Sequence, residues 1–72
     1  MPAERHLTPY RRHLLSLLSD SPLSVASIAL AVYGRDPTFD ESEAVSRQLR
    51  QMAQFGFVAF VGLGWVRKGG AR

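Results

Sequence analysis

The residues with the clearest recognition chemistry are the arginine, glutamine and serine side chains between positions 42 and 54. An arginine guanidinium matches the paired acceptors of guanine, and serine hydroxyls and glutamine amides can bond to base edges or to phosphate oxygens. This row of donors predicts contact with a nucleic acid. The candidate residues are Ser42, Ser46, Arg47, Arg50, Gln51 and Gln54.

An amphipathic helix would bring these side chains onto one surface. Val45, Leu49 and Met52 are three and four residues apart, so a helix turns all three toward a core. A step of ~100° per residue then directs Glu43, Arg47, Arg50 and Gln54 outward, with Ser46 and Gln51 at the edges. Such a helix fits the ~12 Å major groove. We expect Arg47 to contact bases and Arg50, a turn further along, to contact phosphate.

Both ends of this helix carry sequence signals. Asp40 and Glu43 have the spacing of a capping box, in which Asp40 accepts from the Glu43 N–H and the Glu43 carboxylate reaches back. Gly56 suits the left-handed position just past a helix end. The predicted helix therefore covers Glu41–Phe55.

An ordinary solvated helix face is the alternative interpretation of the same row. Glu43 and Arg47 are four residues apart, in the order that favours a weak ion pair of about 0.2–0.5 kcal/mol. For Arg47 both interpretations stay open. Glu43 is most simply explained as the acceptor of the capping box.

The charge along the chain is uneven and favours an anionic partner for the second half. The formal net charge is +3, yet residues 1–43 hold four arginines against six acidic residues. Residues 44–72 hold four arginines and one lysine with no acid. A local excess of this sign attracts phosphate-rich partners.

Length and composition exclude several classes of protein. A chain of 72 residues forms one domain, and the absence of cysteine rules out disulfides and thiolate metal sites. The apolar runs are shorter than the ~20 residues that span a bilayer, so we expect a cytoplasmic protein with no membrane contact. His6 and His13 alone offer little for catalysis or metal binding, and we predict neither an enzyme nor a metal site.

Two shorter helices are predicted before the basic one. Thr8 followed by Pro9 is typical of a helix start, and this helix should run to Ser19. The second should start after Ser24 and stop at Gly34. Its inner stripe is Val25, Ile28, Ala29 and Val32, while Leu30 projects from the other side.

After Gly56 the sequence predicts a β-hairpin. The runs 57–61 and 65–67 are rich in aromatic and β-branched residues and flank Gly62-Leu63-Gly64, which leaves a two-residue or a three-residue loop open. The ends 1–7 and 69–72 are expected to be flexible. Core or core-edge positions are expected for the aromatic residues Tyr10, Tyr33, Phe39, Phe55 and Trp65.

In this order of elements the chain resembles the winged helix-turn-helix domain, from about Thr8 to Lys68. The resemblance is carried by "LLSLLSDSPLSVASIALAVYG", "SEAVSRQLRQMAQFGFV" and "VGLGWV". It implies an α+β fold, mainly α, with a recognition helix over 41–55 and a wing over 57–68. It also implies a small transcriptional regulator that binds double-stranded DNA. We expect no cofactor. Arg67 and Lys68 on the wing would then contact the phosphate backbone of the DNA.

The wing departs from that resemblance at its tip. DNA-binding members often carry basic wing tips, whereas Leu63 occupies this one, with Phe60 nearby. A winged-helix module that docks on another protein through Leu30, Phe60 and Leu63 is therefore the alternative function. The same apolar residues predict a homodimer, which we expect to pair through the surface of the first two helices.

Overall fold

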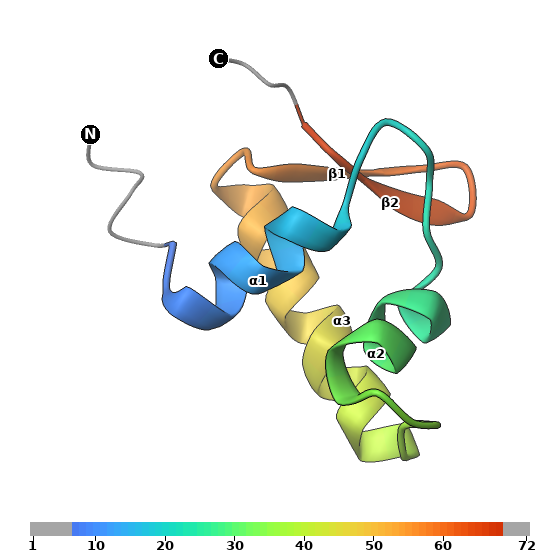
Figure 1. The fold of residues 1–72 in the computed structure, drawn as a ribbon. Coiled ribbons are helices and arrows are strands. Elements are labelled where there is room, and N and C mark those ends of the chain that lie inside the picture. The colour runs from blue at the N-terminus through green and yellow to red at the C-terminus, as the bar shows by residue number, and fades with distance from the viewer. Residues whose placement is uncertain (1–6, 69–72) are drawn as a thin grey trace.

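The computed structural model describes residues 7–68 and contains three helices followed by an antiparallel hairpin (Figure 1). Chain ends 1–6 and 69–72, predicted to be flexible, lie outside the described residues, and Leu7 is half-buried. The fold is α+β and mainly helical, as predicted, and its layout is consistent with a winged helix. Its elements are α1 (Pro9–Leu17), α2 (Val25–Tyr33), α3 (Phe39–Gln54), β1 (Val58–Val61) and β2 (Gly64–Arg67).

The first two helices begin where their capping residues predict. The Thr8 hydroxyl accepts from the Arg11 N–H at 3.2 Å, and the Ser24 hydroxyl accepts from the Ser27 N–H at 3.1 Å. Gly34 ends α2 in the left-handed conformation, with φ 71°. α1 ends at Leu17, two residues before the predicted Ser19, because the chain turns extended at Leu18.

The start of α3 corrects the predicted capping box. Thr38, rather than Asp40, is the N-cap: its hydroxyl accepts from the Glu41 N–H at 3.1 Å. The Glu41 carboxylate accepts from the Thr38 N–H at 2.9 Å and also from the Arg35 guanidinium. This extra cationic partner favours the earlier box, so α3 begins at Phe39, two residues before the predicted Glu41.

α3 ends at Gln54 in a Schellman motif centred on Gly56. Gly56 has φ 86°, and its N–H donates to the Ala53 carbonyl at 3.1 Å. The next N–H, from Phe57, donates to the Met52 carbonyl at 3.0 Å. Both bonds satisfy carbonyls that the helix end would leave free. The predicted role of Gly56 as the stop is confirmed, one residue after the C-cap Phe55.

The hairpin has a two-residue loop, which decides between the two predicted registers. Val61 pairs with Gly64 across the loop, and Phe60 pairs with Trp65. Gly62 takes φ 62° at the first loop position, as tight hairpin turns require. Gly64 therefore belongs to β2 and not to the loop.

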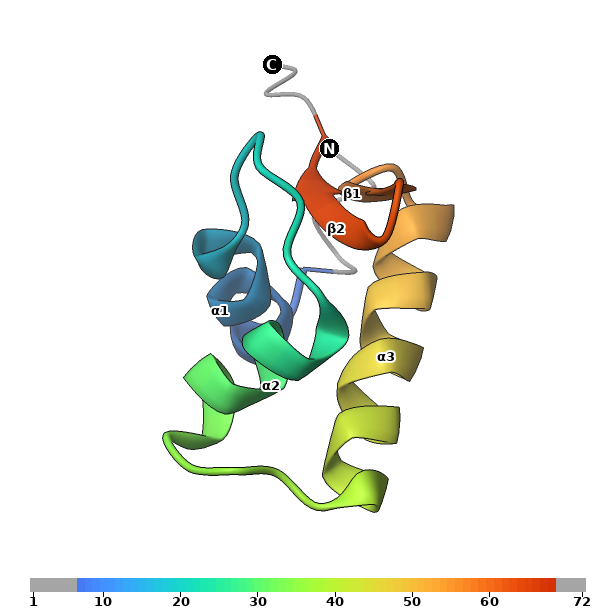
Figure 2. The same cartoon turned by 90° about the vertical axis from the view of Figure 1, so that its right-hand side faces the viewer.

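Leu23 adds one residue of a third strand to the outer side of β2. Its N–H donates to the Trp65 carbonyl at 3.0 Å, and the Trp65 N–H donates to the Leu23 carbonyl at 2.8 Å. A Cβ on Gly64 would lie 2.8 Å from the Leu23 nitrogen, so the segment before α2 can approach only a glycine. In Figure 2 this segment runs past the hairpin before entering α2.

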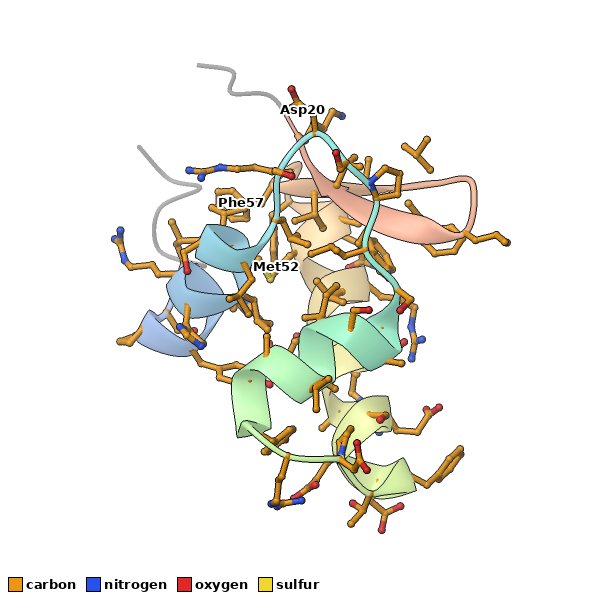
Figure 3. All side chains as sticks on the ribbon, turned by 45° about the vertical axis from the view of Figure 1, so that its right-hand side comes forward. Asp20, Met52 and Phe57 are labelled. Atoms are coloured by element: carbon orange, nitrogen blue, oxygen red, sulfur yellow. The ribbon has the colours of Figure 1, made fainter. Side chains whose placement is uncertain are left out.

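A single core lies between the helices and the hairpin. Met52 of α3 points into its middle (Figure 3), and the predicted stripe of α3 is buried. One aromatic prediction is wrong: Phe39 is 78% exposed, because it occupies the first helical position, away from the core face. Trp65 is buried, Tyr33 half-buried, and Tyr10 and Phe55 are each 38% exposed, so most of their surface is covered. The buried hydrophobic residues are Leu14, Leu18, Ile28, Ala29, Val45, Leu49, Met52, Val58 and Trp65.

Candidate nucleic-acid interface

The outward row of α3, which consists of Glu43, Arg47, Arg50 and Gln54, is exposed to solvent. It lies opposite the buried stripe, as the helical period predicts. In Figure 2 α3 forms one side of the molecule, with α1 and α2 packed on its other side. This side of α3 is therefore open along the helix.

Arg47 is the most available cation of the row. Within residues 7–68, neither Arg47 nor Glu43 has an ion-pair or hydrogen-bond partner for its side chain. The solvated-face interpretation expected these two residues to pair, and they do not. Arg47 is thus a free guanidinium beside a free carboxylate.

Arg50 is held in place by its own helix. Its Nη1 donates to the Ser46 hydroxyl at 2.8 Å, one turn earlier. Ser46 is half-buried and Arg50 is exposed. A hydroxyl is a neutral acceptor, so the remaining donors of the Arg50 guanidinium can still bind an anion.

Gln51 is half-buried at an edge of the outward face, as predicted, and this edge is the one turned toward α1. It faces α1, where its Oε1 accepts from Arg11 Nη2 at 2.5 Å, while Arg11 Nε donates to Gln48 Oε1 at 2.8 Å. The Arg11 guanidinium also lies 5.9 Å from the centre of the Phe55 ring. Gln51 therefore links two helices and is directed away from the outward row.

The link between Arg11 and α3 was not predicted, because the sequence indicates only that each partner lies at the edge of its own helix. Arg11 and Leu14 lie three residues apart, so one turn of α1 places Arg11 at the edge of the buried face. Its partners Gln48 and Gln51 are likewise three apart on α3. No pattern within either helix indicates that the two edges meet.

The remaining predicted contacts on α3 lie near its two ends. Ser42 is half-buried, and its backbone N–H donates to the Thr38 carbonyl at 3.0 Å. Gln54 is exposed in the last turn. Arg47, Arg50 and Gln54 are therefore brought together on the open side, with Ser46 beside them.

Arg67 and Lys68 lie at the base of the hairpin and not at its tip. The Arg67 N–H donates to the Ser19 carbonyl at 2.9 Å, which fastens β2 beside the segment after α1. The Arg67 side chain lines a small hollow of about 190 Å³ together with Arg12 and Ser16 of α1. Arg67 and Arg12 thus form a second group of cations, and Lys68 is exposed just after the strand.

The hairpin tip is apolar and uncovered. Leu63 is 93% exposed, Phe60 58%, and Val61 is also exposed. The Phe60 ring meets the Trp65 ring edge-to-face, with centroids 5.1 Å apart. Leu30 of α2 is 47% exposed, as predicted. Each residue predicted to form a protein interface is therefore accessible.

The electrostatics near the start of α3 are dominated by one ion pair. Arg35 Nη2 lies 2.7 Å from Glu41 Oε2. The hydrogen bond from Arg35, followed by the bond from the Thr38 N–H, lowers the pKa of the Glu41 carboxyl. Glu41 is therefore a structural carboxylate of the helix start.

Among the described residues there is no group of three or more histidine, cysteine or acidic side chains that could hold a metal ion. His13 is exposed, and His6 lies outside the described part. No helix within residues 7–68 is both long enough and apolar enough to cross a bilayer.

Comparisons with known proteins gave no match: no protein-family model, curated protein or solved structure is significantly similar to this chain.

Proposed function

We propose that this protein binds double-stranded DNA as a small winged helix-turn-helix regulator, with α3 in the major groove. The observation that carries the proposal is Arg47, an exposed guanidinium on the open side of a 16-residue helix. It has no partner among the described residues. Arginine in this position can bond to the paired acceptors of guanine.

Arg50, Ser46 and Gln54 support the same contact. Arg50 and Gln54 are exposed on the same side, and Ser46 orients the Arg50 guanidinium. A phosphate oxygen is the natural partner for a held guanidinium at a groove edge. Ser42 remains a candidate for a phosphate contact near the helix start, and Gln51 is withdrawn from the set because Arg11 engages it.

Glu43 limits which bases the row can accept. Its free carboxylate lies one turn before Arg47 and repels phosphate, so the helix must enter with Glu43 over the base edges. There a carboxylate can accept a hydrogen bond from the amino group of cytosine. The proposal therefore includes a guanine and a cytosine within the recognised site.

Duplex binding at a series of salt concentrations tests the proposal. The affinity should fall steeply as salt rises, because each neutralised phosphate releases counterions. Selection from a random duplex pool should then enrich one short sequence. Salt-independent binding, or an unenriched pool, would contradict a sequence-specific DNA-binding function.

The apolar hairpin tip favours a second candidate, a module that docks on another protein. Leu63 and Phe60 project from the tip, and Leu30 adds an apolar residue on α2. Exposed aliphatic and aromatic side chains commonly act as interface anchors. Docking of this kind should be insensitive to salt, unlike DNA binding.

A homodimer would reconcile the two candidates. Pairing through Leu30 and the neighbouring surface of α1 and α2 leaves both copies of α3 free, and a two-fold dimer suits palindromic half-sites ~34 Å apart. Light scattering at tens of micromolar is the direct measurement. A strict monomer, both alone and on a palindromic duplex, would exclude this arrangement.

A further inference from the structure

A pocket lies where the hairpin, α2 and α3 meet. Its walls are Val25 from the first turn of α2, Ser46 and Arg50 from α3, and Phe60 and Trp65 from the hairpin. We call it the aromatic pocket. Its volume is about 460 Å³, within the range of ~300–1,000 Å³ that is common for small-molecule sites. Figure 2 shows the hairpin lying above these two helices.

The body of the aromatic pocket is apolar. Trp65 is only 6% exposed, and the Phe60 ring stands edge-to-face against it at an interplanar angle of 61°. Val25, which is half-buried, also lines the pocket. A planar or branched apolar group placed between these side chains would bury further apolar surface on Phe60, which favours binding.

The polar part of the aromatic pocket consists of the Arg50 guanidinium and the Ser46 hydroxyl that accepts from it. Arg50 is the charged residue among its lining, and no carboxylate lines it. The 2.8 Å bond to the Ser46 hydroxyl holds the guanidinium at the pocket edge. Arg50 has no anionic partner in the described part of the chain, so its charge complements an incoming anion.

We propose that the aromatic pocket binds a small monoanionic ligand with an aromatic or branched aliphatic body. The apolar body lies between Val25, Phe60 and Trp65, and the carboxylate or sulfonate pairs with Arg50. Because Ser46 and Arg50 also belong to the proposed DNA-binding surface, ligand and duplex exclude each other. The mutual exclusion of ligand and duplex rests on the proposed function, whereas ligand binding itself does not.

The chain provides its own reporter, because Trp65 is its only tryptophan and lines the pocket. A suitable probe is anilinonaphthalene sulfonate, an aromatic anion, compared with the neutral phenylnaphthylamine. The anion should bind on the order of tenfold tighter, as expected for a hydrogen bond to a charged group. Trp65 emission should change over the same concentration range. Equal affinity for both probes would overturn the role of Arg50.

Three variants locate the binding. Arg50→Gln should weaken the anion on the order of tenfold and leave the neutral probe unchanged. Val25→Phe should fill the pocket and weaken both probes. Leu63→Ala removes apolar surface outside the lining and should change neither. If Leu63→Ala weakens the probes as much as Val25→Phe does, binding is at the exposed tip and the pocket assignment is wrong. Arg50→Gln changes an exposed side chain and should leave the fold intact. The comparison of the two probes in this variant therefore tests the proposal even if Val25→Phe fails to fold.

Competition between the anionic probe and duplex DNA tests mutual exclusion separately from ligand binding. Displacement of the anionic probe by a duplex that binds the protein supports mutual exclusion, and simultaneous binding overturns it. Probe binding by a protein that binds no duplex would contradict the DNA function and still support the pocket.

Discussion

Helix α3 and the hairpin are the two elements expected to reach DNA, and they expose opposite chemistry. α3 buries its apolar stripe and exposes arginine and glutamine, whereas the hairpin exposes Leu63 and Phe60 and keeps its cations at the base. The helix surface follows from a local period of 3.6 residues. The hairpin surface depends on which distant segment covers each strand. Under the proposed function, sequence-specific contacts would come from α3, and the hairpin would contribute mainly packing and an apolar surface.

The largest expected effect tests the packing role of the hairpin. In Gly64→Ala the new Cβ would meet Leu23 backbone atoms at 2.8 and 2.9 Å and the Pro22 Cβ at 2.9 Å. The Leu23 N–H and carbonyl are hydrogen-bonded to Trp65, so Leu23 cannot move away without breaking those hydrogen bonds. The free energy of unfolding should therefore fall by about 3 kcal/mol, the upper end of typical overpacking. Chemical denaturation measures it.

Gly62→Ala is the matched control for this variant. Gly62 has open space around a Cβ but a φ of 62°, so the loss should be limited to backbone strain of about 1 kcal/mol. Equal losses in the two variants would show that the close approach of Leu23 to the hairpin contributes nothing.

The next largest effects, on DNA affinity and on stability, distinguish the outward side of α3 from the side turned toward α1. Arg47→Ala should relax preference at one base position by ~1–3 kcal/mol, with little change in the melting temperature. Gln51→Ala removes an acceptor of Arg11 and should lower stability by about 1 kcal/mol, with little change in DNA affinity. Binding isotherms and thermal melts on both variants give the four values.

The outcome that contradicts this division is the reverse pattern. If Gln51→Ala weakens DNA binding while Arg47→Ala does not, the face turned toward α1 is the functional one, and the outward row is ordinary solvated surface.

The contrast between α3 and the hairpin also explains which features could be predicted from the sequence. The buried and outward sides of α3 and its glycine stop follow from local spacing, and all were correct. Thr38–Glu41 and Asp40–Glu43 both have capping-box spacing, so choosing between them required Arg35, which folds back onto Glu41. The Leu23–Trp65 bridge joins residues far apart in sequence, and a single leucine carries no pattern that identifies its partner.

The position of Arg67 was unpredictable for a similar reason. Its strand was predicted, but its neighbour Arg12 comes from a helix that no local rule connects to β2. The site on α3 was therefore more predictable than the site on the hairpin. Helical contacts repeat along one element, whereas hairpin contacts depend on the whole fold.

A moderate effect tests the corrected start of α3. Thr38→Ala should lower stability by about 1 kcal/mol, because the Glu41 N–H loses its acceptor. Asp40→Ala should lower it by only about 0.3 kcal/mol, through the helix dipole. Urea denaturation of the two variants compares them directly. A larger loss from Asp40→Ala would restore the capping box that the sequence suggested.

The smallest effect concerns pH and the ion pair at the start of α3. Arg35, and then the Thr38 N–H, lower the pKa of Glu41 in the folded protein, below its ordinary value of 4.5. A depressed carboxyl pKa stabilises the fold above the unfolded pKa, and the contribution is lost as pH falls through the lower folded value. Glu41→Gln keeps a capping-box side chain but removes the charge. The parent should therefore be slightly more stable than this variant near neutral pH, and the difference should shrink as pH falls below 4.5. Thermal melts from neutral to acidic pH measure the trend, and it should be small because the pair is at the surface and screened by salt.

Glu43→Gln is the matched control, because it removes the same charge from the same helix without touching Arg35. An equal pH trend in that variant would assign the effect to net charge and not to the Arg35–Glu41 pair.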